Sequence, residues 1–202
     1  DAVSRGIELA TISEFEDELY SEIQKDKNWG FEKVFLNGEN LRFGKDLNDW
    51  VIENVLFKVL YPAEFHGQSA IEASVKLSDL YKEKEQEIEK IIVETHEPAI
   101  RIISNKENLK NASDRDHSLE FMVAAGLLFK EVNSKTYEDN FSGLKQIENL
   151  RRKIKAQENK EFTENYYDMS KRHIANTVYF EYTDSSFSKK ETVETPIGHP
   201  NR

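Results

Sequence analysis

Two long segments of the chain have apolar residues at helical spacing. Between residues 66 and 83 the apolar positions repeat along one face, which predicts a helix with one buried side. Residues 119–129 are apolar nearly all round, so a second helix there should be buried on several sides. Ser113 or Asp114 can accept hydrogen bonds from the first free amides of a helix. We therefore expect the second helix to begin there and to reach Lys130.

Three further segments show weaker helical patterns. Residues 1–28 carry apolar side chains at three-to-four spacing among carboxylates, and residues 136–140 can form a short helical turn. Residues 144–154 predict an amphipathic helix whose outer face is basic from Arg151 to Lys155. Because Glu and Asn are interspersed with these cations, a solvated face is the favoured interpretation and a nucleic-acid contact is the second.

Four segments have the pattern of β-strands. Residues 175–183 alternate between apolar and polar positions, which predicts a half-buried strand, and a turn joins it to a weaker strand at residues 189–195. Residues 88–96 predict another strand. Residues 51–61 are an almost unbroken apolar run, and this predicted strand should end at Pro62 because proline lacks a backbone N–H.

The order of these elements indicates the fold class. Asn37-Gly38 tolerates positive φ at both positions and lies between apolar runs, which predicts a β-hairpin over residues 31–43. Residues 45–50 are a polar connector and the strongest candidate for a domain boundary. From residue 51 onward the order is strand, helix, strand, helices, strand, strand. This order predicts an α+β fold, a two-layer domain of mixed or antiparallel strands packed on helices.

The composition excludes several classes of function. The 202 residues are 38% hydrophobic and 33% charged and include 12 Phe, 8 Tyr and 2 Trp, which is typical of a globular protein with a well-solvated surface. A net charge of −10 argues against nucleic acid or an anionic membrane as partner. The absence of Cys excludes disulfides and thiolate chemistry and is compatible with a reducing compartment. The longest apolar run, residues 121–129, is too short for a membrane-spanning helix, which needs about 20 residues.

Polar side chains of four kinds gather where the predicted strand 51–61 meets the helix after it. A lysine inside such an apolar run needs solvent or a partner, so Lys58 either pairs with a substrate carboxylate or extends to water from an edge strand. Glu64, His66 and Gln68 point the same way if the backbone is extended. If it is helical, Glu64 and Gln68 stack and His66 turns away. His66 is an acid–base candidate; alternatively, it only hydrogen-bonds the backbone near a helix start.

The segment Asp114-Arg-Asp-His also has two interpretations. As structure, it is an acidic helix start in which Arg115 pairs with an aspartate. As function, Arg115 is a clamp for a carboxylate, and His117 is a second acid–base group at a helix N-terminus. His96 and His173 lack partners at metal-ligand spacing, and no glycine-rich phosphate loop is present, so neither a metal nor a nucleotide is expected.

Five short segments occur in order along nearly the whole chain: Asp1-Ala-Val-Ser-Arg-Gly, Phe57-Lys-Val-Leu-Tyr-Pro-Ala-Glu-Phe-His-Gly-Gln, Asp114-Arg-Asp-His, Lys171-Arg-His-Ile-Ala-Asn and Pro196-Ile-Gly-His. Together they resemble the corresponding segments of the 2-methylcitrate dehydratase (MmgE/PrpD) family. The resemblance implies a large all-helical domain joined to a smaller α+β lid. Residues 1–48, with the hairpin, would then end the helical domain, residues 49–197 would form the lid, and residues 198–202 a tail. Members are more than twice this length, so we expect a piece of a longer protein.

The resemblance also implies an activity. Such a protein is a hydro-lyase that removes water from a tricarboxylate, converting 2-methylcitrate to 2-methyl-aconitate without a metal or other cofactor. On that expectation the catalytic candidates are Lys58, His66 and His117. The substrate-binding candidates are Glu64, Gln68, Asp114 and Arg115. The family also includes a cis-aconitate decarboxylase and an epimerase, although His66 and residues 114–117 fit the dehydratases best.

The expected partners follow from the same resemblance. They are the tricarboxylate, a preceding helical domain and a second copy of the chain, in the bacterial cytoplasm or the mitochondrial matrix. Because family members draw further acid–base residues from the helical domain, we expect this chain alone to be inactive. The rival function, from another class, is a non-enzymatic binding or dimerisation module. A degenerate paralogue that keeps only the fold is a third alternative.

Overall fold

The chain divides into two compact units, Asp1–Glu53 and Asn54–Arg202. The computed structural model describes residues 1–14, 24–42, 56–104 and 108–202. The predicted connector 45–50 and the first part of the predicted strand 51–61 lie outside these residues. The two units are described separately below.

The first unit contains two described helices, α1 (Ala2–Ser13) and α2 (Phe31–Phe35). Helix α1 confirms the first half of the helical pattern in residues 1–28, but residues 24–28 form turns. Asn37 and Gly38 both have positive φ, 54° and 88°, as the Asn-Gly pair predicts.

The β-hairpin predicted over residues 31–43 is nevertheless wrong. The Asn-Gly pair ends helix α2, because the amides of Leu36 and Gly38 both donate to the carbonyl of Glu32, at 3.1 and 2.8 Å. Left-handed residues close a helix as readily as they join two strands. Residues 39–42, which follow the turn, form no strand.

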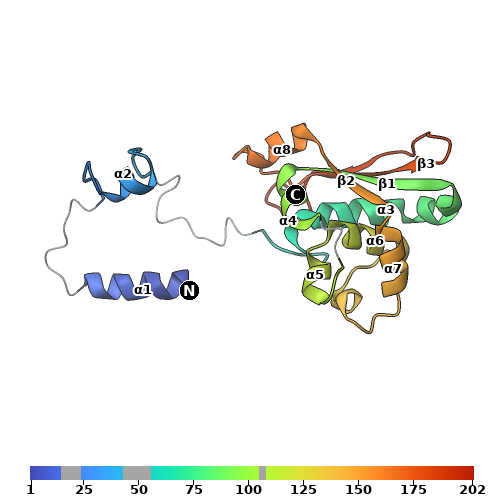
Figure 1. Ribbon diagram of the computed structural model, residues 1–202, viewed down its shortest axis with the longest axis horizontal. Helices are drawn as coiled ribbons and strands as arrows, with labels where there is room; N and C mark the ends of the chain where they lie inside the picture. The colour runs from blue at the N-terminus through green and yellow to red at the C-terminus, as the bar shows by residue number, and fades with distance from the viewer. Residues whose placement is uncertain (15–23, 43–55, 105–107) are drawn as a thin grey trace. The chain divides into compact units, whose positions relative to one another are not determined.

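The second unit is built on a four-stranded sheet in the order β2-β1-β3-β4 (Figure 1). Its strands are β1 (Ile88–Thr95), β2 (Ile154–Glu158), β3 (Asn176–Tyr182) and β4 (Glu191–Val193). Strand β1 pairs with β2 in parallel and with β3 antiparallel, and β3 pairs antiparallel with β4. Strands β1, β3 and β4 confirm three predicted strands, and the mixed sheet on helices confirms the α+β fold class.

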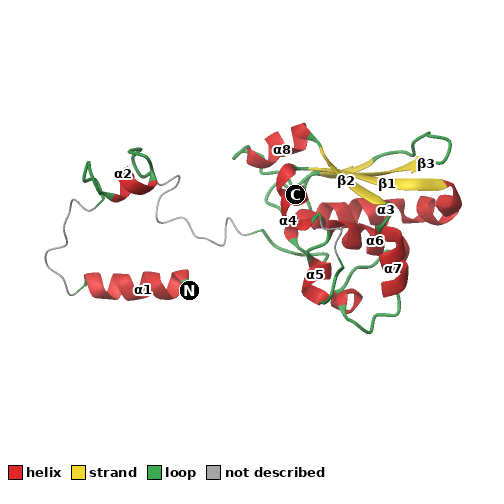
Figure 2. Ribbon diagram, viewed as in Figure 1, coloured by secondary structure: helices red, strands yellow, loops and turns green. Residues whose placement is uncertain are grey.

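Helices α3 (Gln68–Lys84) and α6 (Leu119–Phe129) pack against the sheet, and α7 (Leu144–Arg151) packs on α6 (Figure 2). Helix α6 is buried from Leu119 to Leu127, as its all-round apolar pattern predicts. It lies directly against α3, where a Cβ atom on Gly126 would be 2.1 Å from Ser74 Oγ. A larger residue there would separate the two helices that form the centre of the core.

The helix predicted from residue 113 or 114 to Lys130 is interrupted. The structure has α5 (Ala112–Asp116) and then α6, with the backbone extended at Ser118. Asn111 caps α5 and the Ser118 side chain caps α6 by accepting from the Phe121 amide at 3.3 Å. Ser113 and Asp114 are therefore not the capping residues. A serine that caps a new helix start interrupts an otherwise continuous pattern.

Other sequence-based boundaries also differ. Residues 56–61 form no strand, so the described part of the strand prediction for residues 51–61 is wrong. Ile154 belongs to strand β2 and not to the helix before it. The sequence patterns did not identify β2, α4 (Glu97–Ile103) or α8 (Lys160–Tyr167). The remaining short helices in the described part of the chain are η2 (Phe65–Gly67), η3 (Glu85–Glu87) and η4 (Ser134–Tyr137).

The last five residues are held to the second unit and do not form the expected tail. Arg202 donates to both carboxylate oxygens of Glu72 on α3 at 2.7 Å and to the Thr195 carbonyl at 2.7 Å. His199 is buried, and its Nε2 donates to the Arg172 carbonyl at 2.9 Å. These contacts join the C-terminal segment to the helix that follows the Glu64 to Gln68 region.

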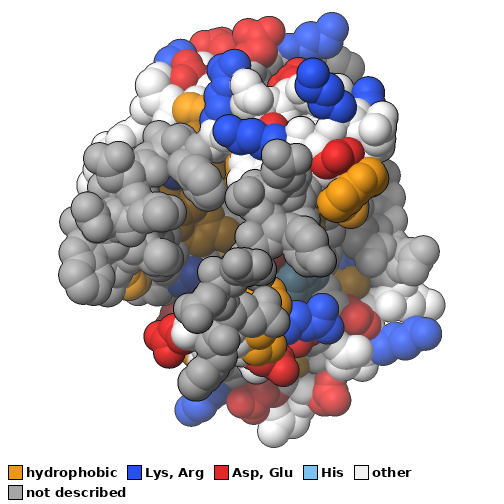
Figure 3. All heavy atoms as spheres, turned by 90° about the vertical axis from the view of Figure 1, so that its left-hand side faces the viewer, with side chains coloured by type: hydrophobic (Ala, Val, Ile, Leu, Met, Phe, Trp, Pro, Cys, Tyr) orange, Lys and Arg blue, Asp and Glu red, His pale blue; other side chains and the backbone are white. Residues whose placement is uncertain are grey.

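Charged side chains of both signs are interspersed on the face shown in Figure 3. This mixture fits the high charged fraction of the sequence. None of the described helices combines the length and apolar character that crossing a bilayer requires.

Candidate functional site

Glu64 and His66 form a close pair at the start of η2. One carboxylate oxygen of Glu64 accepts from the backbone amide of His66 at 2.8 Å, and the other lies 2.7 Å from His66 Nδ1. Both side chains are only about one-seventh exposed, at 15% and 14%. The backbone here is a short 3-10 turn, so neither the extended nor the α-helical alternative of the sequence describes it.

The electrostatics of this pair fix its protonation. Burial raises the pKa of Glu64, but the hydrogen bonds and charge of His66, and the charge of His117, outweigh it and leave that pKa below its ordinary value. Glu64 is therefore an ionised carboxylate at neutral pH. An ionised carboxylate only accepts hydrogen bonds, so His66 Nδ1 carries a proton and donates it to Glu64. In the neutral imidazole Nε2 is then the unprotonated nitrogen.

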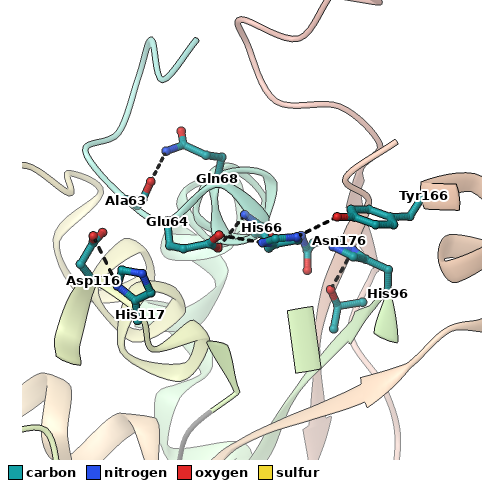
Figure 4. A network of polar contacts seen from close by, with 10 residues as sticks. Ala63, Glu64, His66, Gln68, His96, Asp116, His117, Tyr166 and Asn176 are labelled. Atoms are coloured by element: carbon teal, nitrogen blue, oxygen red, sulfur yellow. Dashed lines mark hydrogen bonds and ion pairs between the residues drawn. The ribbon is translucent and has the colours of Figure 1, made fainter. Parts of the chain in front are cut away.

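Two aromatic residues from distant parts of the chain complete the surroundings of His66 (Figure 4). Tyr166, on α8, places its hydroxyl 3.3 Å from His66 Nε2. His96, between β1 and α4, stacks on the Tyr166 ring with centroids 4.7 Å apart and an interplanar angle of 12°. The rings of His96 and His66 are 5.2 Å apart. Glu64, His66 and Tyr166 thus form a continuous chain of hydrogen-bonding groups.

His96 is fully buried and neutral. Burial, followed by the charge of His66, lowers the pKa of His96 from 6.5 to about 4. Its Nδ1 lies 3.4 Å from the Ala175 carbonyl and 3.3 Å from Thr95 Oγ1. Because a carbonyl only accepts, Nδ1 carries the proton, and Nε2 is left without a hydrogen-bond partner among the described residues.

Asn176, the first residue of β3, holds the backbone of His66 in place. Its Nδ2 donates to the His66 carbonyl at 2.9 Å and to Ser69 Oγ at 2.8 Å. The Ser69 hydroxyl in turn donates to the Ile174 carbonyl. Asn176 and Ser69 are fully buried, so these bonds hold the η2 turn against the sheet.

Gln68 has a structural role in this arrangement. Its side-chain amide donates to the Tyr61 carbonyl at 2.7 Å. It also donates to the Ala63 carbonyl at 2.9 Å, as Figure 4 shows. The side chain is buried. It therefore fixes the backbone that leads into Glu64.

The segment from Asp114 to His117 lies beside this site but is arranged differently. The Glu64 amide donates to the Asp116 carbonyl at 3.4 Å, which brings α5 next to η2. His117 is half exposed, and its Nδ1 is 3.1 Å from the Ser113 carbonyl and 3.7 Å from Asp116 Oδ2. Asp114 accepts from the Lys110 amide at 2.8 Å, a contact within its own turn.

The buried side chain of Arg115 contacts residues of the Tyr137 to Asp139 segment. Its guanidinium donates to the Tyr137 carbonyl at 2.5 Å and to Asp139 Oδ1 at 2.7 Å, and its side chain is 8% exposed. The sequence expected it to pair with a neighbouring aspartate, and the aspartate it contacts is 24 residues away. Its contacts are those of a buried structural arginine.

Lys58 lies in irregular backbone and is exposed. The amide of the preceding residue, Phe57, donates to the Gly198 carbonyl at 3.3 Å, which ties this segment to the C-terminal residues. Within the described residues the Lys58 ammonium has no ion pair or hydrogen bond. The position of Lys58 thus agrees with the interpretation in which its side chain extends to solvent. Its role in binding a substrate carboxylate stays a prediction.

The structure therefore brings together Glu64 and His66, places His117 within electrostatic reach, and adds three residues that sequence reasoning did not select. These are His96, Tyr166 and Asn176. His96 was considered only as a metal ligand, and Asn176 only as the last residue of a similar segment. Thr95 pairs with Asn176 across β1 and β3, and this pairing brings His96, the residue after Thr95, close to Asn176.

Chemically, the arrangement has the groups that a proton transfer needs. A carboxylate held on one nitrogen of an imidazole orients the ring and stabilises its protonated form, and the other nitrogen can then accept or donate a proton. Among the described residues no three His, Asp or Glu side chains converge as metal ligands would.

Comparison with known proteins places the chain in a family. Residues 61–202 match the MmgE/PrpD C-terminal domain. The whole chain is 42% identical to 2-methylcitrate dehydratase of Escherichia coli K12, 37% identical to that of Cupriavidus necator and 35% identical to the mitochondrial 2-methylcitrate dehydratase of Yarrowia lipolytica. It covers 42%, 42% and 39% of those proteins, so it spans about two-fifths of their length. The chain belongs to the MmgE/PrpD family.

Proposed function

We propose that this chain supplies the acid–base pair of a hydro-lyase that eliminates water from a tricarboxylate, with 2-methylcitrate as substrate and 2-methyl-aconitate as product. The similarity to proteins named 2-methylcitrate dehydratase supports the substrate class. The single observation that carries the site is the 2.7 Å contact between Glu64 and His66 Nδ1 in a largely buried setting. It leaves Nε2 as the reactive nitrogen.

The reaction needs two proton transfers. A base removes a proton from the carbon next to a carboxylate, and the electron pair of that C–H bond forms the carbon–carbon double bond. The C–O bond to the neighbouring carbon breaks, and the leaving hydroxide takes a proton from an acid and departs as water. His66 Nε2 accepts the C–H proton, and the Glu64 carboxylate stabilises the imidazolium that results.

The second proton transfer and the carboxylate binding are assigned to groups around this pair. His117 is the candidate acid, because it is half exposed and close enough for its charge to lower the pKa of Glu64. Lys58 is the candidate cation for a substrate carboxylate, because it is exposed and without a partner among the described residues. Arg115 already donates to Tyr137 and Asp139, so a substrate-binding role would require it to leave them.

Further groups come from outside the chain in this proposal. The chain covers about two-fifths of the relatives' length, so the preceding helical domain and a second subunit supply the remaining substrate contacts. The 202-residue chain alone is then inactive. No cofactor enters the proposal.

The test is an assay of the full-length polypeptide that contains this sequence. It is given 2-methylcitrate, and the unsaturated product is followed by ultraviolet absorbance. We expect turnover by the full-length protein and none by the 202-residue chain. Release of carbon dioxide from cis-aconitate, without dehydration of 2-methylcitrate, would instead assign the decarboxylase chemistry.

A further inference from the structure

We infer that Tyr166 is a positioning residue for His66, and that His96 holds the Tyr166 ring in place by stacking. The inference rests on the proposed function for its catalytic meaning and on the geometry alone for its structural part. Tyr166 lies 100 residues from His66 in the sequence and reaches it from a different helix, α8.

The contact of Tyr166 with His66 can be kept in both protonation states. Glu64 holds Nδ1, so Nε2 is the only ring nitrogen left for another partner. When Nε2 is unprotonated, the Tyr166 hydroxyl at 3.3 Å donates to it; when Nε2 carries a proton, the hydroxyl oxygen accepts from it. A hydroxyl can serve in both ways, whereas an amide N–H or a carbonyl could serve in only one. The imidazole plane is therefore fixed at both nitrogens before and after proton transfer; while Nε2 accepts the C–H proton, its single lone pair faces the substrate and the Tyr166 hydroxyl releases it.

His96 fixes Tyr166 from the other side. The two rings are nearly parallel, with an interplanar angle of 12° and centroids 4.7 Å apart. His96 is completely buried and directed by its Nδ1 contacts, so it has little freedom to move. Burial keeps this imidazole neutral, because the pKa of His96 is lowered to about 4. A neutral ring does not repel the imidazolium that forms 5.2 Å away on His66.

The neighbouring Tyr167 provides a matched control. Its ring lies perpendicular to that of Tyr166, at 90°, and its hydroxyl is 3.4 Å from Glu97 Oε2 on α4. It is 58% exposed and does not contact His66. One tyrosine hydroxyl on α8 can therefore be removed within the site, at Tyr166, or beside it, at Tyr167.

The first experiment measures the nitrogen-15 resonances of the His66 ring in the 202-residue chain. Wild type is expected to show Nδ1 protonated and Nε2 unprotonated at a pH where the ring is neutral. Tyr166→Phe should displace the Nε2 resonance and leave Nδ1 on Glu64, because only the Nε2 partner is removed. Tyr167→Phe should leave both resonances at their wild-type positions. Thermal unfolding curves check that each variant is folded.

A second pair of variants tests the stacking. His96→Phe keeps an aromatic ring against Tyr166, and His96→Leu removes it while filling a similar volume. The phenylalanine variant should keep the wild-type Nε2 resonance, and the leucine variant should displace it. Equal spectra for the two variants would show that stacking on residue 96 does not hold Tyr166.

The kinetic experiment uses the full-length polypeptide. Because a misplaced catalytic group lowers turnover more than binding, Tyr166→Phe should reduce kcat by about 10- to 100-fold and change KM by less than about twofold. Tyr167→Phe should leave both constants near wild type. His66→Gln, assayed beside them, tests the proposed function separately.

These outcomes can be told apart. An Nε2 resonance in Tyr166→Phe that matches Tyr167→Phe, or a normal kcat in Tyr166→Phe while His66→Gln is inactive, overturns the inference. If His66→Gln is fully active, the proposed function fails, and the positioning role of Tyr166 is then tested by the nitrogen-15 spectra alone. A displaced Nε2 resonance then supports the positioning role, and an unchanged one overturns it.

Discussion

Two polar segments that look alike in the sequence have different surroundings in the structure. Each contains a carboxylate and a histidine within three residues: Glu64 with His66, and Asp116 with His117. The first pair is 2.7 Å apart and about one-seventh exposed. In the second the distance is 3.7 Å, and the histidine is 52% exposed.

The difference shows what distinguishes an enclosed histidine from a surface one. His66 is enclosed by groups from three other segments, Tyr166 on α8, His96 after β1 and Asn176 on β3. Among the described residues, His117 has its hydrogen bond and ion pair with Ser113 and Asp116 of its own turn, and its charge lowers the pKa of Glu64. Burial strengthens the electrostatic coupling of the first pair, and water screens the second.

The largest expected effect tests this comparison directly. His66→Gln should lower kcat of the full-length polypeptide by about 10²–10⁴-fold, the usual contribution of a general acid or base. His117→Gln should lower it by less than about tenfold, because water can take the place of an exposed acid. Steady-state kinetics on 2-methylcitrate give both values. Equal losses in the two variants would show that burial does not separate the two histidines.

The next effect concerns stability and pH. The pKa of His96 is about 4 in the folded state and 6.5 without the fold. Between these two pH values the unfolded chain binds a proton at His96 that the folded chain does not bind. The contribution of His96 to the free energy of unfolding is therefore complete above pH 6.5 and is lost as the pH falls toward 4. The loss is about 3 kcal/mol of unfolding free energy.

Denaturant unfolding of wild type and His96→Phe at pH 7.5 and pH 4 measures this contribution. Both proteins carry the same carboxylates, including Glu64, whose lowered pKa also removes stability as the pH falls through it. The wild type should lose more stability than His96→Phe over this range. Parallel losses would mean that His96 is not the buried neutral group described here.

A smaller effect is expected at Arg115. Arg115→Met keeps the length of the side chain but leaves the Tyr137 carbonyl without its donor. We expect the free energy of unfolding to fall by about 2 kcal/mol. Lys58→Met is the matched control and should change it by less than about 0.5 kcal/mol, because Lys58 is exposed. Similar values for the two variants would contradict the structural role of Arg115.

The smallest effect separates the two contacts of Arg115. Asp139 is 79% exposed, so its ion pair with Arg115 is screened by water. Asp139→Asn should change the free energy of unfolding by about 0.5 kcal/mol or less. A loss as large as that of Arg115→Met would show that the aspartate, and not the Tyr137 carbonyl, holds the arginine.

Several elements follow from local sequence alone. Residues close in sequence are enough to predict the apolar repeat of α3, the all-round apolar α6 and the alternation of β3. The structure contains all three elements. Strand β2 is different, because in Ile154-Lys-Ala-Gln-Glu only Ile154 and Ala156 alternate with polar residues, and Ile154 also continues the helical repeat before it. Its backbone becomes a strand by pairing with β1 from Ile91 to Thr95. For α8 a signal was present, since Asn159 caps the amides of Glu161 and Phe162.

The Asn-Gly pair marks a limit of local reasoning. The positive φ angles of Asn37 and Gly38 follow from the residue types. Whether the residues before the turn are strand or helix depends on which carbonyl the turn amides meet, and here it is the Glu32 carbonyl. The turn could be predicted, and the hairpin could not.

The sequence by itself determined the α+β class, the family, and two members of the site, Glu64 and His66. It did so because helical and strand periods, and a contact between residues two apart, are local properties. Only the tertiary structure decided that Tyr166, His96 and Asn176 surround His66, and that Arg115 turns toward Tyr137. Those contacts join residues 22 to 110 positions apart. The contacts of His66 depend on the pairing of β1 with β3 and on the position of α8, and that of Arg115 depends on the packing of α5 against η4, which no single segment specifies.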